Sequence, residues 1–318
     1  SMHKSHKLLY FYMKKEFEVY FQPKFRFADS EVIGAEALIR WNNPEKGFLS
    51  PGTFIPLFEH NGFIQKIDLY VFERVCRFLD SWNHSGPDGT CPHPITISFN
   101  LSRFHLYNPN LIKDLTAIQK NYTIAPCQIE VELTESVMFD NKKRLIHIMN
   151  QIKDSGFTIS VDDFGSGYSS LNVLKDFSFD VMKIDMVFLS SFDNNKAKSM
   201  AVIKNVINLA NDLGMRTLTE GVETIEEAEY LKDAGCERLQ GYLFGKAMPL
   251  KEVARIGLPA GIQGTLFSIS NVIIQSPVNS LGAEMMSGSA SSANIENFIY
   301  IGMMAFANAT ITFTSQCI

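Results

Sequence analysis

Acidic and amide side chains recur where the short apolar segments of this 318-residue chain end. The polar residues at these places are Glu36, Asn100, Glu132, Glu135, Asp162, Asp163, Lys183, Asp185, Glu220, Glu223 and Gln240. Carboxylates gathered in one place would repel one another and take up protons, because neighbouring like charges raise one another's pKa. The single charge of Lys183 is too small to offset so many acids. If these residues meet, we expect a bound cation among them.

The ligand atoms available for such a cation are mainly oxygens. The histidines of the chain lie outside these segments, which argues against a His-rich zinc site. Carboxylates together with one amide oxygen from Asn100 suit Mg²⁺ or Mn²⁺. Neighbouring strand residues point to opposite faces, so Asp162 and Asp163 can both enter one site only if the chain turns there, which Gly165 and Gly167 permit. Such a pair can lie between two ions.

Two divalent ions about 3.5 to 4 Å apart can hold water as hydroxide, bind a phosphoryl group and stabilise the leaving oxygen. The pattern therefore predicts hydrolysis of a phosphoester. Glu220 is a candidate metal ligand and general base, and Lys183 could hold the attacking water or neutralise charge on phosphorus. Arg40, four residues after Glu36, has the planar donor group that binds phosphate oxygens.

Short segments rich in β-branched and aromatic residues alternate with segments of helical period from residue 18 to about residue 245. The expected strands are residues 19–24, 32–39, 95–101, 129–133, 158–162, 181–184, 216–218 and 238–243. Eight strands in βα order favour a closed α/β barrel, which commonly needs roughly 250 residues. In such a barrel the carboxyl ends of the strands meet at one rim, where catalytic groups from several strands come together.

The first two expected strands follow each other directly and turn around Asp29-Ser30, which predicts a hairpin and one strand antiparallel to the rest. The expected helices are residues 67–82, 110–120, 142–154, 169–175, 196–213 and 225–233. Gly156, Gly214 and Gly235 each follow one of these helices, as is typical of a left-handed helix end. Residues 83–94 combine Gly, Pro, Asn and Asp, which indicates a surface loop.

The composition limits the classes of protein that the chain can belong to. With 46% hydrophobic and 20% charged residues, the chain should fold around a sizeable core. Lys and Arg number 29 against 34 Asp and Glu, so the net charge of −5 provides no basic surface field and argues against duplex nucleic acid as a partner. The five cysteines form no C-x-x-C pair, which fits a reducing cytosol better than a disulfide framework.

The two ends of the chain differ from its middle. Residues 259–318 contain no Lys or Arg. Residues 297–318 are uncharged and about as long as a bilayer span, but polar residues interrupt them and no basic flank anchors them. A membrane span, a packed accessory segment or partner surface, and mobile residues all stay open for this extension. Residues 1–15 are expected to form a lead-in segment in which Ser1 before Met2 is typical of a cleaved tag, so the natural protein could begin further upstream.

The motifs of the chain, taken in order, resemble those of the EAL-domain family of cyclic-di-GMP phosphodiesterases, named for the tripeptide that stands here as Glu36-Ala37-Leu38. The other matching motifs are Gln22-Pro23, E-A-L-x-R-W, N-x-S, E-x-T-E, D-D-F-G-x-G-Y-S-S-L, K-I-D, E-G-V-E-T and Q-G-Y. The resemblance covers residues 16–258, and leaves residues 259–318 as an extension of unknown role. It implies a modified TIM (β/α)8 barrel with one antiparallel strand, in agreement with the hairpin predicted above.

The resemblance also implies a role for each polar residue. The implied metal ligands are Glu36, Asn100, Glu132, Asp162 and Asp163, with Glu220 completing the ligands of the second ion. Lys183 would orient the attacking water. Glu135 would brace the loop of residues 163–169, whose placement couples dimerisation to activity in the family. The residues implied to contact the substrate are Gln22, Arg40 and Gln240, while Glu223 would support the site.

The activity implied by the resemblance is metal-dependent opening of one 3′,5′-phosphodiester bond of cyclic di-GMP to give linear pGpG. Two Mg²⁺ or Mn²⁺ ions would be the cofactors, and Ca²⁺ should inhibit because it takes more ligands at longer distances. The expected partners are cyclic di-GMP, a second copy of the chain, and an upstream sensor or GGDEF module. The expected location is the cytoplasm, with anchoring of the full-length protein at the inner membrane as an alternative.

Other interpretations stay open on the sequence alone. The chain could be a non-catalytic cyclic-di-GMP receptor with the EAL fold, or a scaffold that binds no nucleotide. Acids near a helix N-terminus are stabilising without any catalytic role, and this applies most to Glu135 and Glu223. Lys183 could lie on the surface, Arg40 could pair with a structural acid, and Asn100 could bond to a neighbouring turn. Thr219, Gly245 and Ala247 depart from the family pattern, but none of these departures removes a ligand.

Overall fold

The computed structural model describes residues 16–26, 28, 31–139, 141–165, 174, 176–185 and 192–249. All of them belong to the first of the two units into which the chain divides, Ser1–Gly257. Five predictions fall wholly or partly outside the described residues. These are the lead-in segment 1–15, the turn at residues 29–30, the extension 259–318, the loop of residues 163–169 from residue 166 on, including Gly167, and, apart from Leu174, the helix over residues 169–175.

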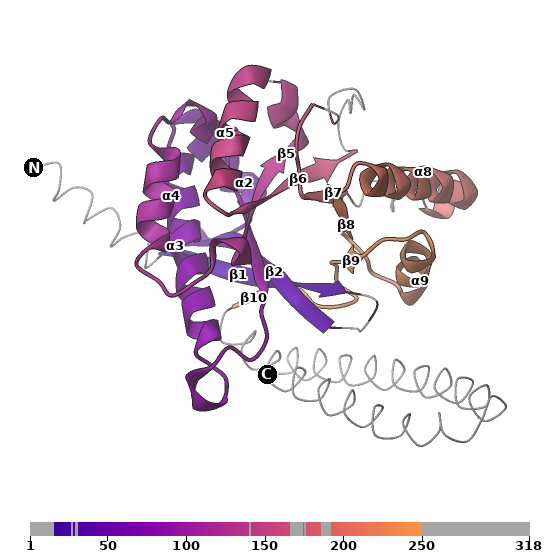
Figure 1. The fold of residues 1–318 in the computed structure, drawn as a ribbon, viewed down its shortest axis with the longest axis horizontal. Coiled ribbons are helices and arrows are strands. Elements are labelled where there is room, and N and C mark those ends of the chain that lie inside the picture. The colour runs from indigo at the N-terminus through magenta and orange to yellow at the C-terminus, as the bar shows by residue number, and fades with distance from the viewer. Residues whose placement is uncertain are drawn as a thin grey trace, which may run out of the picture. The chain divides into compact units, whose positions relative to one another are not determined.

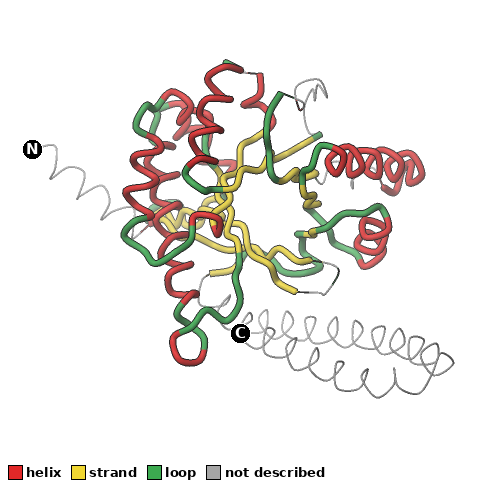
Figure 2. Tube along the Cα trace, viewed as in Figure 1, coloured by secondary structure: helices red, strands yellow, loops and turns green. Residues whose placement is uncertain are grey.

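Eight strands close into a barrel, seen end-on in Figures 1 and 2. They are β1 (Phe17–Arg26), β2 (Glu31–Asn43), β4 (Thr96–Asn100), β5 (Ile129–Thr134), β6 (Thr158–Phe164), β7 (Val181–Ile184), β8 (Arg216–Thr219) and β9 (Arg238–Leu239). Closure comes from β1, which pairs antiparallel with both β2 and β9, while the other neighbours pair parallel. The predicted barrel with one antiparallel strand is confirmed.

The helices lie around the outside of the barrel (Figure 2). They are α2 (Pro51–His60), α3 (Ile64–Asn83), α4 (Leu111–Gln119), α5 (Lys142–Asp154), α8 (Phe192–Asp212) and α9 (Ile225–Asp233). Gly156, Gly214 and Gly235 have φ values of +88°, +73° and +90° where helices end, as predicted. No helix among the described residues has both the length and the apolar character needed to cross a membrane.

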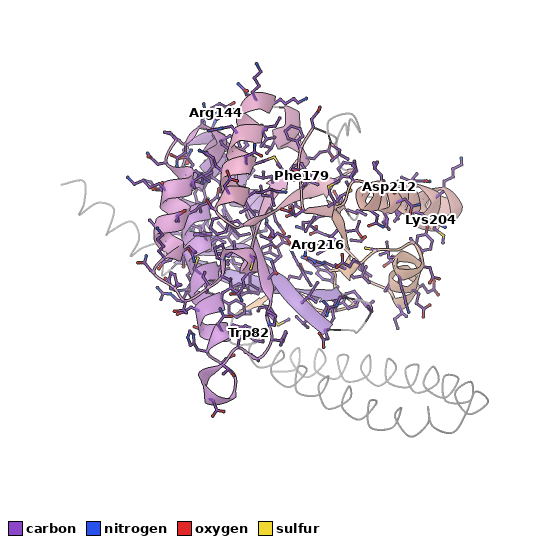
Figure 3. All side chains as sticks on the ribbon, viewed as in Figure 1. Trp82, Arg144, Phe179, Lys204, Asp212 and Arg216 are labelled. Carbon is purple, nitrogen blue, oxygen red and sulfur yellow. The ribbon has the colours of Figure 1, made fainter. Side chains whose placement is uncertain are left out.

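Among the α-helices and strands of the described residues, α2, β3 (Gly47–Leu49) and β10 (Met248–Pro249) were not predicted. The two strands are very short, and α2 begins with Pro51 and contains Pro56, which hides its helical period. After α3 the chain folds back over residues 84–94 with a short 3₁₀ turn, Pro87–Gly89. Trp82, labelled in Figure 3, anchors this loop by donating from Nε1 to the carbonyl oxygen of His93 at 2.9 Å.

The two faces of the barrel sheet have different chemistry. Most outward-facing side chains of the strands are apolar and pack against the helices. Phe99 of β4, for example, lies 5.2 Å from Phe72 of α3 between ring centroids. The side chains between them point into the barrel, and several are polar although fully buried, including Ser98, Glu132 and Lys183. Because an unpaired charge is costly in such a place, these groups must pair with one another or with a ligand.

Candidate active site

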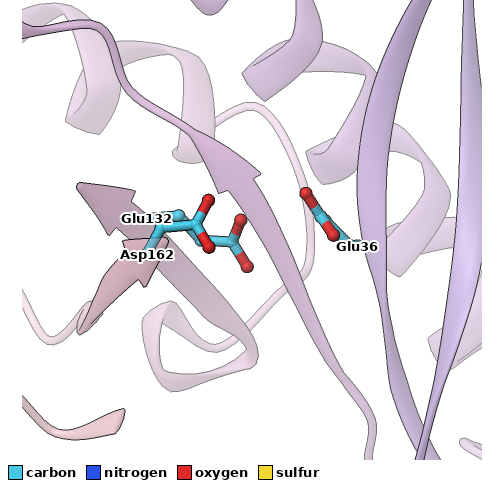
Figure 4. A group of neighbouring side chains, drawn as sticks. All are labelled: Glu36, Glu132 and Asp162. Atoms are coloured by element: carbon cyan, nitrogen blue, oxygen red, sulfur yellow. The ribbon is translucent and has the colours of Figure 1, made fainter. Parts of the chain in front are cut away.

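Glu36, Glu132 and Asp162 form a cluster inside the barrel (Figure 4). Each offers one carboxylate oxygen, and these oxygens lie within 4.8 Å of one another. The three residues come from β2, β5 and β6, and all are buried. The register of the strands brings them together: Glu36 pairs with Ser98 on β4, and the last residue of β4, Asn100, pairs with Glu132 on β5.

Lys183 of β7 lies in the middle of the acids. Its Nζ is 2.8 Å from Glu132 Oε2, 2.8 Å from Asp162 Oδ1, 2.7 Å from Glu220 Oε1 and 3.7 Å from Glu36 Oε2. Glu220 directly follows β8 and is partly buried. The structure therefore brings four acids from four strands around one ammonium group. One positive charge among four carboxylates leaves an excess of negative charge that a bound cation would offset.

The pKa values of the acids show how uneven this environment is. Burial, followed by the charge of Glu132, raises the pKa of Glu36 to about 7. Burial also raises the pKa of Asp162 and raises that of Glu220 well above its usual range. Glu132 behaves in the opposite way, because the charges of Lys183 and Lys24 overcome its burial and lower its pKa to about 2. In the absence of a metal ion, Glu132 therefore stays ionised while its neighbours hold protons more readily.

The backbone turns at Asp163, an exposed acid next to Asp162 at the end of β6. Its φ is +56°, in the left-handed region, and the pairing of β6 with β7 shifts register between Val161 and Phe164. Asp is one of the few non-glycine residues that tolerate this conformation. The turn predicted for the pair thus occurs at Asp163 itself, with Gly165 (φ +101°) following it. Partial burial and the charge of Asp162 raise the pKa of Asp163 to about 6.

Three amide side chains surround Glu36. Asn100 Nδ2 donates to Glu36 Oε1 at 3.0 Å, and Gln240 Nε2 donates to Glu36 Oε2 at 2.7 Å. Gln240 Nε2 also lies 3.4 Å from Gln22 Oε1, and Gln22 Nε2 donates to the carbonyl oxygen of Gly245 at 3.2 Å. Donation from Nδ2 leaves the Asn100 carbonyl oxygen available as a ligand. The amides predicted to bind metal and substrate are thus brought together with the acids.

Arg40, Glu135 and Glu223 lie further from the acid cluster. Arg40 is half-buried, its guanidinium carbon is 5.7 Å from the ring centroid of Tyr20, and burial lowers its pKa. Glu135 is buried, and its Oε2 accepts a hydrogen bond from the Gly165 backbone at 3.1 Å, at the start of the loop it was predicted to brace. The Glu223 side chain is exposed just before α9. Of these three, Glu135 has the most direct link to the site.

The ion pair of Lys24 and Glu130 inside the barrel was missed by the sequence analysis. Lys24 of β1 contacts Glu130 and Glu132 of β5, at 3.0 and 3.1 Å, and all three are buried. The interior therefore holds a second ammonium group next to the acid cluster. The spacing was a signal that could have found them. Gln22 and Lys24 are two residues apart, as are Glu130 and Glu132, and side chains two apart in a strand lie on the same face.

The donor set fits small divalent cations. Its members are carboxylate oxygens from three strands within 4.8 Å of one another, with Glu220 linked to them through Lys183 and the Asn100 amide bonded to Glu36. Mg²⁺ and Mn²⁺ prefer such oxygen ligands. Asn100, Asp162, Lys183, Glu220 and Gln240 all lie at or just beyond the carboxyl ends of their strands, the position of the active site in α/β barrels. The fold and the site together define a barrel of the TIM type with an acidic mouth whose oxygens suit a divalent cation.

Comparison with known proteins identifies the family of TIM-type barrels to which this chain belongs. The model of the EAL domain family matches residues 7–247. The chain belongs to the EAL domain family.

Two relatives and one solved structure show how far the similarity extends. Cyclic di-GMP phosphodiesterase NbdA of Pseudomonas aeruginosa is 33% identical over 235 residues, which are 74% of this chain and 29% of the relative. The bifunctional diguanylate cyclase/cyclic di-GMP phosphodiesterase MucR of the same species is 31% identical over 76% of this chain and 34% of its own length. The MucR phosphodiesterase in complex with c-di-GMP has a TM-score of 0.70, with 31% identity over 78% of this chain and 98% of that one. The chain thus spans about a third of the length of these curated relatives.

Proposed function

We propose that this chain is a metal-dependent phosphodiesterase that hydrolyses one 3′,5′ bond of cyclic di-GMP and releases linear pGpG. The observation that carries the proposal is the convergence of Glu36, Glu132 and Asp162 on Lys183 inside an EAL-type barrel. Supporting it, two relatives similar over three quarters of this chain are named as cyclic di-GMP phosphodiesterases.

Two Mg²⁺ or Mn²⁺ ions would be held by the acids and one amide. The proposed ligands are Glu36, Asn100, Glu132, Asp162, Asp163 and Glu220. When bound, such ions lower the pKa of water and stabilise charge on phosphoryl oxygens. Asp163 has the conformation needed to stand beside Asp162 as a ligand, since its left-handed backbone redirects the chain at the end of β6.

The residues of the chain supply proton transfer and orientation. Glu220 is the proposed general base, because its Oε1 lies 2.7 Å from Lys183 Nζ, where a water held by the lysine would be within reach of the carboxylate. Lys183 contacts Glu220 Oε1 at 2.7 Å and donates in the direction of the acids, where it can orient that water. Gln22, Arg40 and Gln240 are the proposed substrate contacts, and Arg40 can donate two parallel hydrogen bonds to a phosphate. Glu223 would support the site from the N-terminus of α9.

Regulation of this activity is proposed to involve a second copy of the chain and a further module. Glu135 holds the backbone of Gly165, and so connects the site to the loop of residues 163–169. We propose a homodimer that acts through this loop. MucR is named as a bifunctional diguanylate cyclase and phosphodiesterase, which supports a GGDEF or sensor module as a partner of this barrel. The proposed location is the cytoplasm, where cyclic di-GMP is a second messenger.

The proposed function is tested by measuring turnover of cyclic di-GMP by the wild type and by variants in which a proposed metal-binding residue is replaced. With Mn²⁺ or Mg²⁺ present, the wild type should convert cyclic di-GMP to pGpG. Glu36→Ala and Asp162→Ala should each lower kcat by more than about 100-fold, the upper end of losses seen when outer partners of metal ligands are removed. Glu229→Gln, an exposed acid on α9, is the matched control and should keep full activity. Binding of cyclic di-GMP without turnover in any divalent ion would favour a receptor instead.

A further inference from the structure

Lys24 is a buried cation that none of the proposed roles uses. It lies on β1, only 3% exposed, and its Nζ donates to Ser98 Oγ at 2.7 Å, to Glu130 Oε1 at 3.0 Å and to Glu132 Oε1 at 3.1 Å. The residue opposite it on β2 is Gly34, which brings no side chain into the barrel at this level. The lysine side chain reaches across to β4 and β5, where its Nζ contacts Ser98, Glu130 and Glu132.

Glu132 is held from two sides. Its Oε1 faces Lys24 and its Oε2 faces Lys183, at 3.1 and 2.8 Å. The two ammonium groups occupy different places. Lys183 is also in contact with Asp162 and Glu220, so it lies where a metal ion would enter. Lys24 lies on the opposite side of Glu132, against Ser98 and Glu130. A cation entering among the acids can replace the Lys183 contact, and it leaves the Lys24 contact in place.

We propose that Lys24 is a positioning residue that keeps Oε1 of Glu132 engaged inside the barrel and leaves only Oε2 for a metal ion. This inference rests on the metal site proposed above. A carboxylate limited to one oxygen suits Mg²⁺ and Mn²⁺, which take six ligands at short distances. Ca²⁺ takes six to eight ligands and often binds both oxygens of one carboxylate. Lys24 thereby favours the small ions over Ca²⁺.

A purely structural role for Lys24 makes a different prediction. Glu130 is 1% exposed and would be a buried charge without Lys24, so the lysine could serve only to neutralise it. In that case, replacing Lys24 and Glu130 together by neutral residues would leave the preference for Mn²⁺ over Ca²⁺ unchanged. The double variant Lys24→Met/Glu130→Gln removes the positive charge together with the acid that needs it. It therefore preserves the charge balance while deleting the contact to Glu132.

The test is isothermal titration of the full chain with Mn²⁺ and with Ca²⁺, in the absence of nucleotide. The proteins are the wild type, Lys24→Met, Glu130→Gln and the double variant. Removing the Lys24 charge also removes a repulsion that acts on any divalent ion. Because Mn²⁺ and Ca²⁺ carry the same charge, this effect cancels in the ratio of their dissociation constants. That ratio reports the number of Glu132 oxygens available to the ion.

We expect the wild type and Glu130→Gln to bind Mn²⁺ in clear preference to Ca²⁺. In Lys24→Met and in the double variant the preference should fall about tenfold, as when an outer partner of a metal ligand is lost. A folded double variant with the wild-type ratio, or with a larger one, would overturn the inference and leave the proposed phosphodiesterase intact. If Lys24→Met does not fold, the double variant carries the test alone. A wild type that binds no Mn²⁺ would contradict the proposed metal site itself.

Discussion

Replacing Lys183 by methionine should destabilise the metal-free protein and increase its response to metal. The side chain has about the same length, so the change removes mainly the charge. Nζ of Lys183 lies within 2.8 Å of Glu132, Asp162 and Glu220, and the lysine is 1% exposed. Without it these acids face one another in a buried place and must either repel or take up protons.

The size of the effect follows from the burial. Removing one partner of a buried ion pair costs about 3 to 5 kcal/mol. For a domain of this size each kcal/mol shifts the melting temperature by about 2 to 4 °C, so Lys183→Met should melt about 6 to 20 °C below the wild type in EDTA. A divalent ion at about 100 times its dissociation constant stabilises the folded state by about 2.7 kcal/mol. The variant should gain more than the wild type, because no ammonium group competes with the ion.

Thermal denaturation followed by circular dichroism, in EDTA and in Mn²⁺, measures both quantities. Lys142→Met is the control, since Lys142 forms an exposed ion pair with Asp176 at 2.5 Å, and such pairs contribute little. Its melting temperature should stay near that of the wild type under both conditions. Equal melting temperatures for Lys183→Met and the wild type in EDTA would refute the placement of Lys183 among the acids. Equal stabilisation of the two proteins by Mn²⁺ would refute the competition between lysine and metal.

Two further predictions concern protonation and backbone conformation. Mn²⁺ affinity should rise as the pH increases from about 6 to about 7, because Asp163 and Glu36, with pKa values of about 6 and about 7, must lose their protons to bind metal. In EDTA the raised pKa of Glu36 has the opposite effect. Between pH 4.5 and about 7 the folded state binds one more proton at Glu36 than the unfolded state does. The contribution of Glu36 to the free energy of unfolding is therefore lost as the pH rises through that range. Calorimetric titration across this interval would show a flat Mn²⁺ affinity if the assignment is wrong. Asp163→Val should be less stable than Asp163→Asn by about 1 to 2 kcal/mol in urea denaturation with EDTA, because Val does not tolerate the left-handed backbone, and equal stabilities would contradict that reading.

The strands and most helices of the barrel could be predicted from local pattern. The helices over residues 142–154 and 225–233 have the predicted bounds as α5 and α9. Their starts carry strong signals, since Asn141 caps α5 and Thr224 forms a capping box with Glu227 at α9. The strand expected over residues 238–243 ends at Leu239 instead. Beyond it Gly241 lies against the backbone of Val222, so the chain turns where the apolar pattern continues.

The candidate site was only partly accessible to sequence reasoning. The acids follow apolar strands, so their convergence could be expected, as could a cation among them. The contacts of Lys183 with four acids depend on the register across β5, β6 and β8, which no local pattern specifies. Lys24 was missed although it shares a strand face with Gln22, because its contacts with Glu130 and Glu132 form only where β1 and β5 meet inside the closed barrel. The turn at Asp163 was expected, but it was attributed to the glycines that follow.

The most direct test of the central claim is the fate of cyclic di-GMP incubated with this chain in Mn²⁺ and in EDTA, with the products identified by mass. The account predicts conversion to linear pGpG, heavier than the substrate by one water molecule, in Mn²⁺ only. Unchanged cyclic di-GMP in Mn²⁺, or equal conversion in EDTA, would contradict a metal-dependent phosphodiesterase built on Glu36, Glu132 and Asp162.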